Sequence, residues 1–115
     1  MEISVTRYYD KNKNEVDGTI GKADWVSYIR SCPLLSAETA LLRGRHPTTG
    51  AEILIAPRPD VGYFMQGGER VAIQYNDGDL WTECEWDDTA KSVLGEIAKL
   101  FGAVLLVENG EVITM

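Results

Sequence analysis

The sequence is poor in the residues that most catalytic and metal centres require. It contains one histidine and two cysteines among 115 residues. The histidine, His46, stands between Arg45 and Pro47 in a predicted hairpin turn, where a solvated side chain is far more common than a general base. Cys32 and Cys84 are widely separated, and neither belongs to a C-x-x-C pair. We therefore expect no catalytic residue and no zinc site.

The chain also lacks an excess of positive charge and a long apolar run. Its formal net charge is −7 and its sequence pI is about 4.6. Nucleic acid and anionic membranes repel such a surface, so we expect neither as a partner. No apolar run approaches the roughly 20 residues of a membrane span. The first residues also show no basic region followed by an apolar one, as a secretory signal would. The two cysteines could be bridged, but two reduced thiols in a cytoplasmic protein are the preferred interpretation.

Length and composition are those of one ordinary globular domain. With 44% hydrophobic and 25% charged residues, we expect a single domain over residues 1–115 with one core. Alternating residues bounded by turn residues predict short strands at 3–8, 40–45, 51–56, 63–65, 71–75, 79–87, 103–107 and 111–114. Runs of strands without regular strand–helix alternation predict an α+β fold, with a mainly antiparallel sheet of about six to eight short strands.

Helical spacing of apolar residues predicts two helices. The first is short, takes Thr19 as its N-cap and places Trp25, Val26 and Ile29 on one face. The second spans Asp88–Phe101 and ends at Gly102, where a left-handed cap belongs. Its apolar stripe, at spacings of three and four, comprises Ala90, Val93, Leu94, Ile97, Ala98 and Phe101. We expect this C-terminal helix to pack on the sheet through that stripe.

Three short motifs are distributed over most of the chain. They are Ala23-Asp24-Trp25, then Pro47-Thr48-Thr49-Gly50-Ala51-Glu52, and the ending Ile97-Ala98-Lys99-Leu100-Phe101-Gly102-Ala103 with Glu108-Asn109-Gly110-Glu111. In these motifs the chain resembles a group of small uncharacterised bacterial α+β proteins, which end in a helix, Leu-Gly-Ala, a strand and an acidic Gly-Glu turn. Phe101 stands here in place of the leucine, and Asn109 in place of an acidic residue. The resemblance implies the architecture and no activity.

The most informative segment runs from Asp77 to Asp88. It holds six carboxylates and two tryptophans, and it has no basic residue. At strand period, one face carries Asp79, Trp81, Glu83, Glu85 and Asp87, and the other carries Leu80, Thr82, Cys84 and Trp86. The second face can enter a core, whereas the first, called here the acidic stripe, would meet water. The candidate partner-binding residues are Asp77, Asp79, Trp81, Glu83, Glu85, Asp87 and Asp88.

The acidic stripe predicts a non-enzymatic interaction protein that binds a basic protein partner. Charges of one sign on a strand face repel each other, and tryptophan is enriched at binding hot spots. The concrete hypothesis is a bacterial immunity or inhibitor protein that neutralises a cationic toxin, by analogy of size and charge. The competing interpretation is the ordinary solvated face of a half-buried sheet, with Trp81 packed beneath the C-terminal helix.

Two other functions stay open. Glu83 and Glu85 would stand about 7 Å apart along a strand and could serve a small-molecule-binding or hydrolytic site. Alternatively, the chain is a structural or regulatory subunit. We expect no cofactor and no metal, because the loop spacing of a calcium site is absent. The basic residues Arg43, Arg45 and Arg58 cluster around the predicted hairpin and would neutralise part of the acidic stripe if the hairpin lay beside it.

Overall fold

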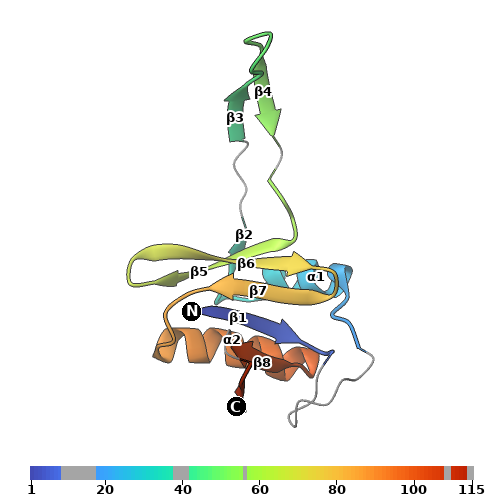
Figure 1. The fold of residues 1–115 in the computed structure, drawn as a ribbon, viewed down its shortest axis with the longest axis vertical. Helices are drawn as coiled ribbons and strands as arrows, with labels where there is room; N and C mark the ends of the chain where they lie inside the picture. The colour runs from blue at the N-terminus through green and yellow to red at the C-terminus, as the bar shows by residue number, and fades with distance from the viewer. Residues whose placement is uncertain (9–17, 38–41, 56, 108–109, 114–115) are drawn as a thin grey trace.

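The structure, a computed structural model, describes residues 1–8, 18–37, 42–55, 57–107 and 110–113 (Figure 1). The strands are β1 (Glu2–Thr6), β2 (Ser36–Ala37), β3 (Leu42–Arg45), β4 (Glu52–Ile55), β5 (Val61–Gln66), β6 (Glu69–Asn76), β7 (Asp79–Glu83), β8 (Val104–Val107) and β9 (Val112–Ile113). The helices are α1 (Lys22–Ser31) and α2 (Asp88–Phe101). The predicted strand residues 40, 41, 56 and 114, and Glu108 and Asn109 of the ending motif, lie outside the described residues.

Antiparallel pairing organises the described strands into two sheets. Seven strands follow the order β2-β5-β6-β7-β1-β8-β9, and β3 pairs with β4 in a separate two-stranded sheet. Every described strand pair is antiparallel. The predicted α+β class, the mainly antiparallel sheet and the packing of the C-terminal helix on that sheet are confirmed.

The core lies between one face of the seven-stranded sheet and the two helices. Because side chains alternate along a strand, the large apolar residues of β1, β6 and β7 point to the same face. The buried core includes Ile3, Val5, Trp25, Ile29, Phe64, Ile73, Leu80, Leu94, Ile97 and Leu105. Both helices therefore cover the same face, and in Figure 1 they lie behind the strands. In the described part of the chain, no helix covers the opposite face.

Helix α2 follows its sequence pattern closely. The carboxylate of Asp87 accepts a hydrogen bond from the backbone N–H of Ala90 at 2.9 Å, which caps the first turn. Gly102 ends the helix in the left-handed region, with a φ of 62°. The backbone N–H of Ala103 then donates to the carbonyl of Ala98 at 2.8 Å. Both ends of the helix are thus fixed by groups that the sequence supplies.

Helix α1 starts later than its sequence suggests. Gly21 occupies the N-cap and supplies no side-chain hydrogen bond, so the prediction of Thr19 as the cap is wrong. The reason is a tertiary contact: the backbone N–H of Ile20 donates to the carbonyl of Gly78 at 2.8 Å, and the Ile20 side chain is buried. This contact keeps the chain extended until Gly21. Trp25 and Ile29 are buried, whereas Val26, predicted on the same face, is only partly buried.

Strands β3 and β4 form a hairpin that projects from the rest of the molecule (Figure 1). The register pairs Arg43 with Leu54 and Arg45 with Glu52. His46 lies exposed in the turn, where its Nδ1 atom accepts hydrogen bonds from the backbone N–H groups of Thr48 and Thr49. The histidine therefore organises a turn, as expected of a surface residue.

Among the described residues, neither helix is both long and apolar enough to cross a membrane. Cys32 and Cys84 are free thiols, with Cys84 buried beside the core and Cys32 partly buried. The interpretation of two unbridged cysteines is confirmed.

The packing of α2 on the sheet can be tested at Ile97, whose side chain is fully buried in the core. We expect Ile97→Ala to lower the free energy of unfolding by about 2–4 kcal/mol, since the substitution removes buried apolar groups and leaves a cavity. Urea denaturation measures the change. Leu100→Ala is the matched control, because Leu100 is 61% exposed on the same helix and its truncation should be nearly neutral. Equal effects of the two substitutions would contradict this packing.

Candidate functional site

Strand β7 carries the centre of the acidic stripe. Leu80 and Thr82 are buried, Asp79 and Trp81 are partly buried, and Glu83 is exposed, so the predicted alternation holds over this strand. The strand ends at Glu83, however, and the predicted continuation of the strand through residue 87 is wrong. The acidic stripe therefore does not extend along one strand face.

Gln66 explains why the strand pattern stops. Its side-chain Nε2 donates to the carbonyl of Glu85 at 2.8 Å, and its Oε1 accepts from the Glu85 N–H at 3.1 Å. The same Nε2 also donates to Asp87 Oδ1 at 2.9 Å. The bonds from the Ala90 N–H and from Gln66 hold the pKa of the Asp87 carboxyl below its usual value. Asp87 is thus committed to capping α2 and to this loop, while Glu85 stays exposed beside it.

The opposite end of β7 is a tight turn with a fixed geometry. Asp77 and Gly78 have φ angles of 48° and 90°, the left-handed pair that a type I′ hairpin requires. A side chain at Gly78 would also collide with Thr19, whose Cβ would lie 2.8 Å away. The Tyr8 hydroxyl donates to the carbonyl of Asp77 at 2.8 Å. An Asp-Gly dipeptide is typical of such a turn.

The structure therefore divides the seven candidate residues between the two ends of β7. Asp77 and Asp79 lie at the turn, Trp81 lies in the middle, and Glu83, Glu85, Asp87 and Asp88 gather where β7 leads into α2. All four carboxylates at the α2 end are exposed, whereas at the turn only Asp77 is exposed and Asp79 is partly buried. The carboxylates that can face a partner together are those at the α2 end.

Trp81 lies on the sheet face opposite the helices. In the register it stands between Ser4 of β1 and Gln74 of β6, and Ser4 in turn pairs with Leu106 of β8. Trp86, which has the opposite parity, packs against the core, whereas Trp81 is not among the described side chains that do so. The interpretation in which Trp81 packs beneath the C-terminal helix is therefore wrong. Its indole is only partly buried, with two polar neighbours beside it.

The surface around this indole is called here the Trp81 face. By register and alternation it includes Glu2, Ser4, Tyr63, Ala72, Gln74, Trp81, Glu83 and Leu106, and Asp79 and the buried Thr6 and Val61 lie on the same side of the sheet. Glu2 and Glu83 stand directly opposite each other on β1 and β7, which concentrates negative charge at one end. At the neighbouring edge the Arg70 guanidinium lies over the Tyr63 ring, 4.0 Å from its centroid. The face thus combines an aromatic centre with a carboxylate border.

Asp79 is the electrostatically unusual member of the stripe. Burial raises the pKa of its carboxyl, and a hydrogen bond with the Thr6 side chain only partly opposes that rise. Its Oδ1 atom is buried and has no hydrogen-bond partner among the described residues. An ionised carboxylate is therefore poorly stabilised at this position, and Asp79 is better placed to destabilise the fold than to attract a partner.

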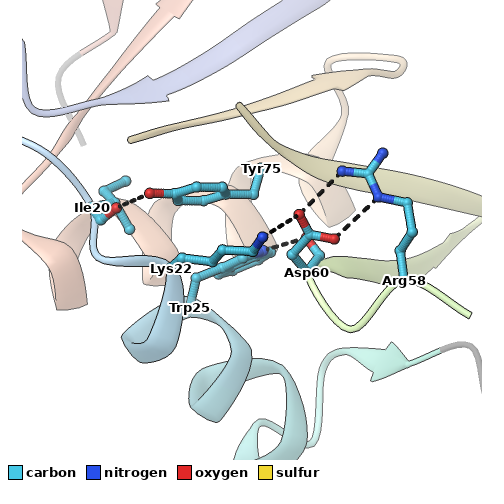
Figure 2. A network of polar contacts seen from close by, with 6 residues as sticks. All are labelled: Ile20, Lys22, Trp25, Arg58, Asp60 and Tyr75. Atoms are coloured by element: carbon cyan, nitrogen blue, oxygen red, sulfur yellow. Dashed lines mark hydrogen bonds and ion pairs between the residues drawn. The ribbon is translucent and has the colours of Figure 1, made fainter. Parts of the chain in front are cut away.

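A second polar cluster, which sequence reasoning missed, surrounds the buried carboxylate of Asp60 (Figure 2). Arg58 binds it through two bonds, Nε to Oδ1 at 3.2 Å and Nη2 to Oδ2 at 3.1 Å. Lys22 Nζ of α1 lies 3.9 Å from Oδ2, and Trp25 Nε1 donates to the Asp60 carbonyl at 2.8 Å. The partner of Arg58 is thus Asp60 and not the acidic stripe. The close spacing of Arg58 and Asp60 in the sequence was the signal that could have found it.

The Asp60 cluster is built for structure. Burial disfavours the ionised carboxylate, but the hydrogen bonds and charge of Arg58, with a contribution from Lys22, outweigh burial and hold the pKa of Asp60 below its usual value. Its carboxylate is fully engaged and offers no free base. The cluster ties α1 to the segment that leads from the β3–β4 hairpin into β5 (Figure 2).

The described residues give little support to a metal site or to a small-molecule or hydrolytic site at Glu83 and Glu85. No group of three or more histidine, cysteine, aspartate or glutamate side chains there could hold a metal ion. A groove of about 520 Å³ runs between α2 and the β8–β9 pair, with Lys91, Lys99 and Leu105 among its lining residues. Neither Glu83 nor Glu85 lines that groove, and the two do not share a strand.

Comparison of the chain with protein-family models, curated proteins and solved structures finds no match. The resemblance to small bacterial α+β proteins therefore stays a prediction, and function has to be argued from the geometry alone.

The raised pKa of Asp79 predicts a stabilising substitution. Because the folded-state pKa lies above the unfolded value of about 3.9, the stability of the fold falls as the pH rises from the unfolded pKa to the folded pKa, and the full loss is present above the folded pKa. We expect Asp79→Asn to raise the free energy of unfolding at pH 7, and the gain to shrink as the pH falls and the wild-type carboxyl becomes protonated. Urea denaturation over a pH series measures both. A variant that is less stable than wild type at neutral pH would contradict this account of Asp79.

The lowered pKa of Asp60 predicts that its substitution, unlike that of Asp79, destabilises the fold. Its contribution to stability is present above the unfolded pKa and is lost as the pH falls through the lower folded value. We expect Asp60→Asn to lower the free energy of unfolding at pH 7 by about 1–3 kcal/mol, because a buried acceptor loses its charge-assisted bonds. The difference in the free energy of unfolding between this variant and wild type should disappear at acidic pH. In the same urea series, a neutral effect at pH 7 would show that the Arg58 pair adds no stability.

Proposed function

We propose that this protein is a non-enzymatic interaction protein that binds a basic protein partner through the Trp81 face and the carboxylates at its α2 end. One observation carries the proposal. Both helices pack on the same side of the sheet, and the opposite side presents a tryptophan in its central strands that packs against neither helix. A partly exposed indole on an uncovered sheet face is a common anchor of protein interfaces.

The neighbours of Trp81 suit such an anchor. Ser4 and Gln74 flank it, so the indole stands beside short or flexible polar side chains that can bond to a partner. Leu106 extends the apolar area across β1 to β8. The arrangement has an apolar centre inside a polar rim, which is the usual anatomy of a protein–protein interface.

The charges favour a basic partner. Glu83, Glu85 and Asp88 are exposed together at the end of β7, and Glu2 pairs with Glu83 across the sheet. With a net charge of −7, the whole molecule would attract a cationic protein and accelerate its association. An inhibitor of the immunity type, which occludes the cationic surface of a toxin, is the specific form of this function that we propose. The free thiols suit a protein that acts in the reducing cytoplasm.

Capture from a lysate of the native host tests the proposal. The wild-type chain should retain a basic protein at low salt and release it at high salt, since exposed charges are screened. Glu83→Lys/Glu85→Lys should lose it. Glu96→Lys is the matched control, because Glu96 is exposed on α2 away from the Trp81 face, and this variant should still capture the partner.

Binding kinetics with the captured partner should then separate the effect of the carboxylates from that of Trp81. Glu83→Lys/Glu85→Lys should slow association and flatten its dependence on salt, because rim charges steer the encounter. Trp81→Ala should speed dissociation, with a loss of about 2 kcal/mol, or roughly 30-fold in affinity. Circular dichroism checks that Trp81→Ala is folded. If this variant unfolds, or if it binds as wild type does, Trp81 is not the anchor of a binding surface.

A further inference from the structure

The β3–β4 hairpin, residues 42–55, is called here the arm. Figure 1 shows it extending away from the sheet, along the molecule's longest dimension of 53 Å. Its strands pair only with each other, and none of its described residues belongs to the core. Because an isolated two-stranded hairpin is at best marginally stable in water, such an arm gains stability from a surface on which it can pack.

One side of the arm is basic with an apolar centre. Arg43 stands opposite Leu54, and Arg45 stands opposite Glu52, so all four side chains belong to one face of the hairpin. Leu54 is 58% exposed, so its apolar side chain is accessible to a partner. Arg43 Nη1 lies 3.6 Å from Glu52 Oε1, but both side chains are largely exposed and this ion pair is weak. Arg45 Nη1 donates a long hydrogen bond of 3.4 Å to the carbonyl of Gly50. Both arginines are exposed, so a stronger acidic partner can compete for them.

The basic side of the arm complements the Trp81 face in chemistry but does not lie against it within one chain. Figure 1 shows the arm pointing away from β7 and β1, which carry Trp81 and its flanking Ser4. The expectation that the hairpin arginines neutralise the acidic stripe fails for this reason. Complementary surfaces that cannot meet within one chain can meet between two copies.

We propose that the Trp81 face binds a second copy of this chain, whose basic arm docks on that face although the whole chain is acidic. Leu54 would pack on the exposed edge of the Trp81 indole, and Arg43 and Arg45 would pair with Glu83 and its neighbouring carboxylates. Each copy offers one arm and one face, so a reciprocal exchange closes into a two-fold symmetric dimer. The inference rests on the proposed function, because it uses the same face, and it makes self-association a competitor of any external basic partner.

Sedimentation velocity of the full chain tests the exchange. Wild type should form a dimer as its concentration rises at low salt, and high salt should weaken that dimer. Arg43→Glu/Arg45→Glu and Glu83→Lys/Glu85→Lys should each weaken it by at least about tenfold, since each places like charges in contact. The charge-altered control Glu96→Lys should leave it unchanged, because Glu96 lies on α2 outside both surfaces.

Mixing the two reversed variants gives the decisive result. In the mixture, the acidic arm of one variant meets the basic face of the other, and the native arm of the second meets the native face of the first. Both contacts are then complementary again, so the mixture should form a heterodimer although each variant alone does not. Recovery of dimer on mixing supports the exchange. Failure to recover dimer overturns it, as does a wild-type chain that stays monomeric at low salt.

The capture experiment distinguishes a failure of the arm exchange from a failure of the proposed function. Arg43→Glu/Arg45→Glu leaves the Trp81 face intact, so this variant should capture the external basic partner at least as well as wild type. A monomeric wild type with capture that depends on Trp81 would refute the arm exchange and leave the proposed function standing. Capture that is unaffected by Glu83→Lys/Glu85→Lys and Trp81→Ala would refute the proposed function itself.

Discussion

Strand alternation in β1, β6 and β7 sends the large apolar side chains Ile3, Ile73 and Leu80 to one side of the sheet, and both helices bury their apolar faces there. Most other features follow from this constraint. The helices cannot also shield the second side, so side chains of opposite parity, with Trp81 among them, form a surface. Cys84, next to the end of β7, and Trp86, in the loop beyond it, also pack against the core. The proposed binding surface and the core are thus two consequences of one alternating pattern.

Local sequence signals predicted the elements whose ends are decided locally. Helix α2 was predictable because Asp87 supplies its cap, Gly102 supplies its left-handed end and the apolar spacing between them is regular. The Asp77–Gly78 turn was predictable because both residues tolerate a positive φ. The start of α1 was not, because the bond between Ile20 and Gly78 joins residues far apart in the sequence. Such a contact leaves no trace in the local pattern.

The acidic stripe shows the same division between local and tertiary information. Alternation correctly separated Leu80 and Thr82 from Trp81 and Glu83. It could not show that the Gln66 side chain would bind both the N–H and the carbonyl of Glu85, where the strand pattern no longer continues. Nor could composition show that Arg58 would be held by Asp60 while Arg43 and Arg45 remain on a projecting hairpin. These positions depend on how the elements pack. As a result, the negative and positive surfaces of this acidic chain lie apart, which is the basis for expecting a basic partner and an exchange between copies.

The central claim is that the sheet face around Trp81, which neither described helix covers, is where this protein meets its partners. Fluorine NMR of a 5-fluorotryptophan-labelled chain tests it most directly, because the three tryptophans report on three sites and Trp81→Phe assigns the relevant signal. The account predicts that the Trp81 resonance shifts when the dimer or the complex with a basic partner forms, while the buried Trp25 resonance stays in place. A complex that forms without a change at Trp81, or that moves only Trp25 or Trp86, would contradict it.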